Sequence, residues 1–153
     1  MRFISALVLF LSLSSIATAQ TGLDEQIALA RQSAHTDRQV LIMGNMQFTA
    51  NESAEFWPAW KAYRAAVAAN SDRTLNLIAD FAQNHEEMTD MKAKELMTDS
   101  FSIRMQSLVI KQQFAQKISK FMPSKKVMRI IQIENKLDAA IEMNLAAEIP
   151  LAK

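Results

Sequence analysis

The chain has no cysteine, and only two glycines and three prolines among its 153 residues. Without cysteine there can be no disulfide, no thiol nucleophile and no lipid anchor attached to a cysteine. No glycine-rich phosphate loop or Gly-x-Ser-x-Gly turn is present. The two histidines, His35 and His85, are far apart in the sequence, and no serine has a nearby base to activate it. We therefore expect a protein that is not an enzyme.

An excess of charge of either sign is also missing. The chain carries 17 Lys and Arg against 16 Asp and Glu, and it contains no long basic run. Nucleic acids and anionic membrane surfaces attract proteins through clustered positive charge. The sequence therefore argues against both as partners.

One long apolar run is present, in residues 1–19, "MRFISALVLFLSLSSIATA". Arg2 precedes the run, and Ala17-Thr18-Ala19 forms a small-x-small site after it, which is the pattern of a secretory signal peptide. The run is too short and too serine-rich at its end for a spanning helix, although an uncleaved anchor is the alternative. We expect cleavage after Ala19, no membrane insertion afterwards, and a single domain over residues 20–153. A cysteine-free exported chain suits a bacterial periplasm, which is the localisation we expect.

The composition of residues 20–153 predicts an all-α fold. Helix-forming Ala, Leu, Met, Lys, Glu and Gln dominate, and no stretch alternates between apolar and polar residues. The segments "FTANE" (48–52), "MTDMK" (88–92) and "MPSKK" (122–126) have the pattern of capped helix starts. They predict about four helices, arranged as a long hairpin or bundle, over residues 23–45, 50–86, 90–121 and 124–148.

Three local features carry further expectations. Pro58 lies well past the start of the second helix, so it should kink that helix or make it begin late. The segment "IPL" (149–151) should end the fourth helix and lay Ile149 and Leu151 against the other helices. The first helix is weakly amphipathic and should be the least anchored element; its best apolar row is Ile27, Ala34 and Leu41.

The other predicted helices carry apolar residues at intervals of three and four, which places them on one face. In the second helix the row is Phe56, Trp60, Tyr63, Val67, Thr74, Leu77, Ile78, Phe81 and His85. In the third helix it is Leu96, Ile103, Ile110, Phe114, Ile118 and Phe121, with a second edge of Met97, Phe101 and Leu108. In the fourth helix it is Val127, Ile130, Ile131, Ile133, Leu137, Ile141 and Leu145.

Two acids, Glu134 and Asp138, fall on the apolar side of the fourth helix. A buried carboxylate needs a cationic or hydrogen-bonding partner. Folding the third and fourth helices back on each other should bring Lys111 level with Glu134, and Arg104 near Asp138 or Glu142. Two basic residues of the second helix could compete, Arg64 and Arg73. These acids either hold helices together or line a polar groove that binds a ligand.

The second helix also has an aromatic cluster. Trp60 and Tyr63 lie on its apolar row, whereas Trp57 lies off it and should either pack or serve as an exposed anchor. The residues predicted to bind a partner are Trp57, Trp60, Tyr63, Arg64 and Phe101.

A metal site is the alternative. "HEEM" places an imidazole, two carboxylates and a thioether at a helix end, and Met-x-x-Met occurs at 43–46 and 88–91. Such ligands suit copper, cobalt or nickel, although methionine is also common in cores and binding surfaces. The candidate ligands are His85, Glu86, Glu87 and Met88, with His35 as a further one. We expect no cofactor, with a divalent transition metal as the alternative.

The residues together resemble the Spy/CpxP family of small periplasmic helical proteins, which is marked by repeated LTxxQ motifs. The matching positions are "FTANE" and "MTDMK", which keep the apolar-Thr pair and lose the Gln, and "MPSKK" stands at a third helix start. The segments "FWPAWKAYR", "QIENKLDAAI" and "LAAEIPL" look more like a proteobacterial group of exported helical proteins within that superfamily. The resemblance covers residues 45–145.

The resemblance implies a thin, curved helical hairpin, usually dimeric. Its concave apolar and basic surface would cradle unfolded clients or the sensor domain of a kinase, and some relatives sense metals. The predicted function is thus an ATP-independent chaperone-like protein or envelope-stress adaptor whose partners are unfolded or envelope proteins or a sensor protein. The alternative function is that of a metal-responsive sensor or buffer. A third possible function is that of a purely structural envelope protein.

Overall fold

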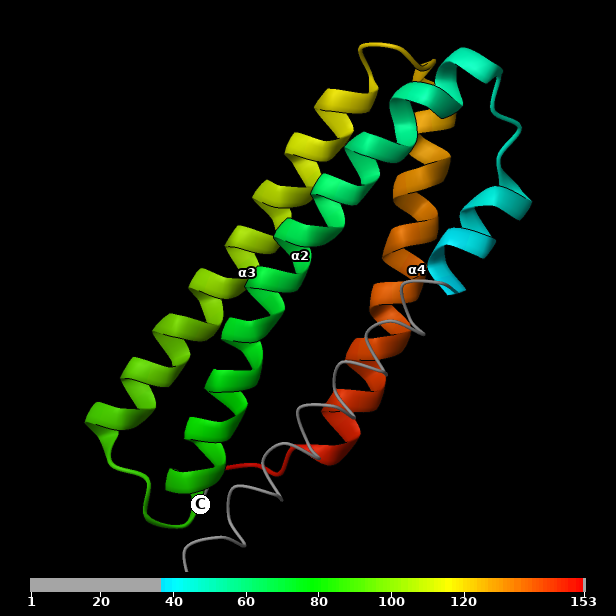
Figure 1. Ribbon diagram of the computed structural model, residues 1–153. Helices are drawn as coiled ribbons and strands as arrows, with labels where there is room; N and C mark the ends of the chain where they lie inside the picture. The colour runs from blue at the N-terminus through cyan, green and yellow to red at the C-terminus, as the bar shows by residue number, and fades with distance from the viewer. Residues whose placement is uncertain (1–36, 153) are drawn as a thin grey trace, which may run out of the picture. The chain divides into compact units, whose positions relative to one another are not determined.

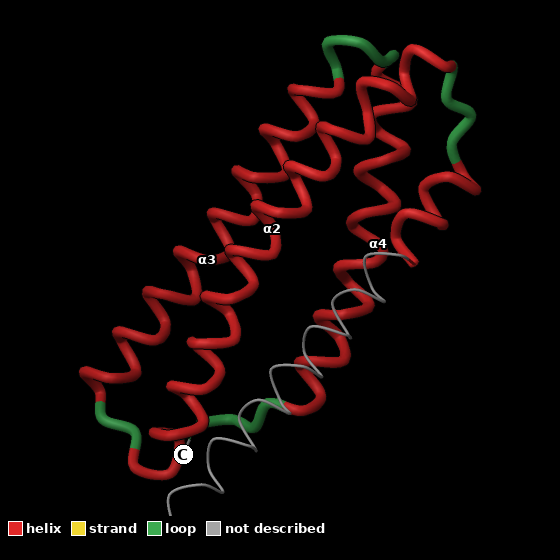
Figure 2. Tube along the Cα trace, viewed as in Figure 1, coloured by secondary structure: helices red, strands yellow, loops and turns green. Residues whose placement is uncertain are grey.

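The computed structural model of the protein describes residues 37–152, and this part of the chain is all-α, as predicted (Figure 1, Figure 2). Residues 37–45 are helical and are followed by the labelled elements. These are helix α2 (Ala50–Asn84), the short 3-10 turn η1 (His85–Glu87), helix α3 (Asp90–Ile118) and helix α4 (Ser124–Glu148). The predicted signal peptide, and the first helix before residue 37, lie outside the described residues. Among residues 37–152, no helix has the length and apolar character needed to cross a membrane.

The chain divides into two compact units, Met1–Leu41 and Ile42–Lys153. In the first unit only residues 37–41 are described, and they are helical. The second unit contains α2, α3 and α4. The prediction of one domain over residues 20–153 stays a prediction.

Local capping explains where the helices of the second unit begin. At the start of α2 the Thr49 backbone N–H donates to Glu52 Oε2 at 2.8 Å, and the Glu52 N–H donates to Thr49 Oγ1 at 3.2 Å. This reciprocal capping box satisfies two N–H groups that the helix itself cannot bond. Thr89 caps α3 by accepting the Lys92 N–H at 3.2 Å. The three predicted starts, at residues 50, 90 and 124, are confirmed.

The helix ends differ slightly from the prediction. α3 ends at Ile118 rather than at residue 121, because Phe121 and Met122 form a turn in which both N–H groups bond to the Ile118 carbonyl. The expected late start of α2 is wrong, since α2 begins at Ala50 and runs through Pro58. Pro58 cannot bond the carbonyl one turn before it, and both residues concerned, Ala54 and Pro58, are exposed, so water can satisfy that carbonyl. The first turns of α2 bend away from the rest of the helix in Figure 1, as a proline kink would.

α2 and α3 run side by side in opposite directions, and α4 folds back from the end of α3 (Figure 1). The core lies where the first half of α2, the second half of α3 and the first half of α4 meet. The Tyr63 ring stacks on the Phe114 ring, with centroids 4.3 Å apart. The buried core residues are Ile42, Met46, Phe56, Ala59, Trp60, Tyr63, Ile110, Phe114, Ile118, Met122, Val127 and Ile130.

The second unit therefore has two unlike parts. We call residues 50–70, 103–118 and 124–134 the three-helix end, and residues 71–84 and 90–102 the two-helix end. Leu96 is the one buried apolar side chain within the residues of the two-helix end, where Leu77 and Phe81 are half-buried. The same apolar spacing along α2 thus leads to full burial at one end and to partial exposure at the other.

The structure corrects the predicted burial of several apolar residues. On α4, Ile141 and Leu145 are exposed, because they lie beyond the three-helix end. In the tail, Leu151 is 89% exposed, so its predicted packing is wrong. In the first predicted helix, Leu41 is exposed and Ile42 is fully buried, so the predicted row is out of phase by one residue.

Candidate functional site

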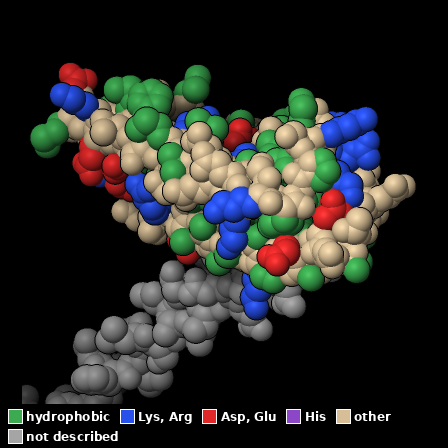
Figure 3. Space-filling view, turned by 90° about the horizontal axis from the view of Figure 1, so that it is seen from above, with side chains coloured by type: hydrophobic (Ala, Val, Ile, Leu, Met, Phe, Trp, Pro, Cys, Tyr) green, Lys and Arg blue, Asp and Glu red, His purple; other side chains and the backbone are tan. Residues whose placement is uncertain are grey.

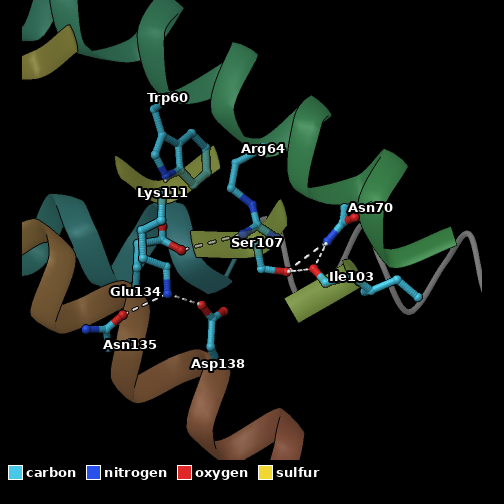
Figure 4. Close-up of polar contacts among 9 residues, drawn as sticks. All are labelled: Trp60, Arg64, Asn70, Ile103, Ser107, Lys111, Glu134, Asn135 and Asp138. Carbon is cyan, nitrogen blue, oxygen red and sulfur yellow. Dashed lines mark hydrogen bonds and ion pairs between the residues drawn. The ribbon is translucent and has the colours of Figure 1, made fainter. Parts of the chain in front are cut away.

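Glu134 on α4 is the most deeply buried polar group of the described chain, with a fully buried side chain. The Trp60 indole Nε1–H donates to Glu134 Oε1 at 3.0 Å, and Arg64 Nη1 lies 3.5 Å from Glu134 Oε2 (Figure 4). Both partners come from α2. The carboxylate therefore ties α4 to α2 through a buried charge-assisted hydrogen bond and a partly buried ion pair.

Lys111 lies level with Glu134, as predicted, because it bonds to the next residue, Asn135, but it is not the partner of Glu134. Its Nζ donates to Asp138 Oδ2 at 2.8 Å and to Asn135 Oδ1 at 2.7 Å (Figure 4). Arg64 of α2, one of the two basic residues that could compete, takes the position beside Glu134. These contacts favour the interpretation in which the acids hold helices together.

The prediction for Arg104 is also wrong. Its side chain is exposed, and among residues 37–152 it forms no ion pair with Asp138 or Glu142. It lies on the side of α3 that faces away from the core. Arg104 is therefore available at the surface.

Asn70 is a structural residue that the sequence analysis missed. Its buried amide Nδ2 donates to the Ile103 carbonyl at 3.0 Å and to Ser107 Oγ at 2.8 Å, which joins α2 to α3 (Figure 4). Arg73 donates to Asn70 Oδ1 at 3.3 Å, so Arg73 does not compete for the acids of α4. Asn70 occupies a position in the apolar row of α2. A polar residue within such a row is the sequence signal that would have predicted a buried hydrogen bond here.

Glu52 makes a further link that local reasoning missed, because its capping role was the only one considered. Lys126 Nζ of α4 forms an ion pair with Glu52 Oε2 and also donates to the Gln47 carbonyl at 2.6 Å. The hydrogen bond from Lys126, aided by that from the Thr49 N–H, holds the pKa of the Glu52 carboxyl below its ordinary value of 4.5. The start of α2 is therefore tied to the start of α4.

The aromatic residues predicted to bind a partner are mostly occupied in packing. Trp60 and Tyr63 are buried, so neither can contact a partner in this structure, and that prediction is wrong for both. Arg64 pairs with Glu134. Trp57 is half-buried, donates from Nε1 to Ser53 Oγ at 3.1 Å and packs edge-on against neighbouring rings. Of the predicted set only Phe101, at 60% exposure, faces solvent freely.

Phe101 belongs to an exposed row on α3. The side chains of Met97, Phe101, Met105 and Leu108 are 54%, 60%, 62% and 68% exposed. Their spacing of three and four residues puts them on one side of the helix, and the buried row that contains Ile103 and Phe114 lies on the other side. We call Met97, Phe101, Arg104, Met105 and Leu108 the exposed α3 face. Figure 3 shows apolar, basic and acidic side chains interspersed on the visible surface.

Two of the predicted metal ligands, His85 and Glu86, make other contacts. His85 Nδ1 lies 2.9 Å from the Ala82 carbonyl, and Nε2 lies 3.1 Å from Glu86 Oε1. Glu87 is exposed, and Met88 is half-buried beside the Phe81 side chain. Within residues 37–152, no three His, Cys, Asp or Glu side chains come together in a way that could hold a metal ion. His35 lies outside the described residues.

The methionine pairs do not form a joint site either. Met43 is exposed while Met46 is buried, and Met91 is 81% exposed while Met88 is half-buried. Most methionines of the described chain lie at the surface rather than in the core; the exposed ones are Met43, Met91, Met97, Met105, Met128 and Met143.

Comparison of the chain with protein-family models, with curated proteins and with solved structures finds no match. The resemblance to the Spy/CpxP family therefore stays a prediction. The function has to be inferred from the side chains themselves.

Proposed function

We propose that the protein is a non-catalytic binding protein of the periplasm, which holds apolar segments of unfolded or envelope proteins against the exposed α3 face. The observation that carries this proposal is the row of exposed Met97, Phe101, Met105 and Leu108 on a helix whose other side is already packed. Isolated exposed apolar residues are common, but a continuous row of them is typical of interaction surfaces.

Energetics and chemistry support the proposal. Burying one large apolar side chain of this kind contributes about 1.5–3 kcal/mol, so a partner that covers the row would gain substantially. Methionine side chains adapt to differently shaped partners, which suits the binding of many clients. Arg104 adds a positive charge between Phe101 and Leu108, in line with the apolar and basic surface that the family resemblance implies.

The test is suppression of the aggregation of a chemically reduced client protein, followed by light scattering. Wild-type protein should slow aggregation at equimolar amounts or below, without ATP and in the presence of a chelator. Replacing Phe101 and Met105 by serine should reduce the suppression several-fold, because both contacts would be lost. The matched control replaces Met128 and Met143 of α4, which are 62% and 71% exposed, by serine, and it should keep full activity.

Two results would contradict the proposal. One is that wild-type protein leaves aggregation unchanged even in several-fold excess, and the other is that both double variants suppress aggregation equally well. Suppression that needs added copper, nickel, cobalt or zinc, and that His85→Ala abolishes, would favour the metal-responsive alternative instead.

A further inference from the structure

A second apolar feature lies at the two-helix end, apart from the exposed α3 face. It is a pocket of about 310 Å³ between α2, α3 and the tail of residues 149–152. Leu77 and Phe81 line it from α2, Leu96 and Ser100 line it from α3, and Ile149 lines it from the tail. We call this feature the two-helix pocket. Its volume is about twice that of an engineered cavity of ~150 Å³ that takes up benzene, and it falls at the lower end of the range for ligand pockets.

The chemistry of the lining limits what can bind there. Among the residues that the structure describes, every side chain that lines the pocket except Ser100 is apolar, and none of them is charged. Two of the walls are α-helices, whose interior N–H and C=O groups are already bonded within the helix. A peptide backbone entering the pocket would lose its hydrogen bonds to water without replacing them, whereas an alkyl chain has none to lose. We propose that the two-helix pocket binds the alkyl chain of a small amphiphile, whose polar head remains in solvent at the opening.

The tail supplies one wall of this site. The Ile149 N–H donates to the Leu145 carbonyl at 3.2 Å, which closes the last turn of α4, and Pro150 then prevents the helix from continuing. Ile149 and Ala152 face the pocket, while Leu151 between them is 89% exposed. The tail therefore contributes two side chains to the wall and points a third one away from it.

The two-helix pocket and the exposed α3 face can be separated experimentally. Ser100 lines the pocket, whereas its neighbour Phe101 belongs to the exposed face and does not line it. Met97 borders both. Binding of an alkyl chain in the two-helix pocket does not depend on client binding at the exposed α3 face. Variants at Ser100 and Phe101 therefore distinguish a failure of alkyl binding from a failure of client binding.

The test is a fluorescence titration of the full protein with N-phenyl-1-naphthylamine, an uncharged apolar probe, with 1-decanol as competitor. The probe should bind one to one, and 1-decanol should displace it. Ser100→Leu places a larger side chain inside the pocket and should weaken probe binding by roughly tenfold or more. Phe101→Ser, the matched control on the adjacent surface, should leave binding unchanged while reducing the suppression of client aggregation.

The tail offers a second matched pair. Ile149→Ser should weaken probe binding several-fold, because one wall loses its apolar side chain, and Leu151→Ser should have no effect. Ala93→Leu is a second pocket-filling variant in case Ser100→Leu does not fold. Equal binding by wild type and a folded pocket-filling variant would overturn the proposal, as would loss of binding in Phe101→Ser.

A measurement on wild-type protein keeps the proposal testable without any variant. In methyl NMR spectra, 1-decanol should shift the signals of Leu96 and Ile149 and leave that of Leu108 in place. Shifts confined to Leu108 would mean that the alcohol adsorbs on the exposed α3 face, and the pocket would then not be its site.

Discussion

The two ends of the α2–α3 hairpin are built from similar sequence patterns and are stabilised differently. α2 carries apolar residues at helical spacing along its length, yet Phe56, Trp60 and Tyr63 are at most 4% exposed, whereas Leu77 and Phe81 are only half-buried. The first half of α4 covers the three-helix end. At the two-helix end, within residues 37–152, the short tail of residues 149–152 meets the corresponding surface and lines the two-helix pocket.

The polar contacts differ in the same way. At the three-helix end the Glu134 carboxylate is fully buried between Trp60 and Arg64. At the two-helix end Lys92 Nζ pairs with Asp80 Oδ2 at 2.7 Å, and both side chains are partly exposed. Exposed pairs contribute little to stability, whereas breaking a buried pair is costly because it leaves a charge without a partner. We therefore expect the three-helix end to carry most of the folding free energy.

The largest expected effect comes from removing one phenylalanine ring from each end of the hairpin, in two separate variants. Phe56→Ala should lower the free energy of unfolding by about 4 kcal/mol, because the ring is fully buried and leaves a cavity. Phe81→Ala removes the same side chain from the two-helix end, where it is half-buried, and should cost about 1 kcal/mol. Urea unfolding followed by circular dichroism measures both. Equal losses would mean that the two ends contribute alike.

A smaller effect is expected from the acids of α4. Glu134→Ala should lower the free energy of unfolding by about 3 kcal/mol, since it leaves Arg64 half-buried without its ion-pair partner. Asp138→Ala breaks the partly exposed pair with Lys111 and should cost less than about 1 kcal/mol. The same unfolding experiment compares the two variants. A loss below about 0.5 kcal/mol for Glu134→Ala would show that this carboxylate does not hold α4 in place.

The smallest effect concerns pH. The pKa of Glu52 is lowered in the folded protein, so its stabilising contribution is complete above pH 4.5 and is lost as the pH falls through the lowered pKa. Lys126→Met, which removes the main cause of the shift, should flatten the acid limb of a plot of melting temperature against pH.

Lys92→Met is the control from the other end of the hairpin. Asp80 holds the pKa of Lys92 above its ordinary value of 10.5, so the stability that this lysine contributes is present below pH 10.5 and is lost as the pH rises through the raised pKa. Its replacement should change the alkaline limb and leave the acid limb as in wild type. An acid limb flattened equally by both replacements would contradict the assignment to Glu52.

Short-range signals predicted the helices well. Thr49 and Thr89 cap helices at the expected positions, because capping depends on residues within one turn. The partners of side chains between helices were harder to predict. Spacing placed Glu134 on an apolar face, but only the docking of α4 decided that Trp60 and Arg64, rather than Lys111, would meet it.

The sequence by itself determined the helical class, the three helix starts and the two faces of α3, because propensity, capping and periodicity act within a few residues of each other. The tertiary structure alone decided which apolar rows are covered. Phe101 and Phe114 both lie at helical spacing on α3, yet one faces solvent and the other lies in the core. Burial depends on the presence of a second surface, and the position of that surface is set by contacts between residues far apart in the chain.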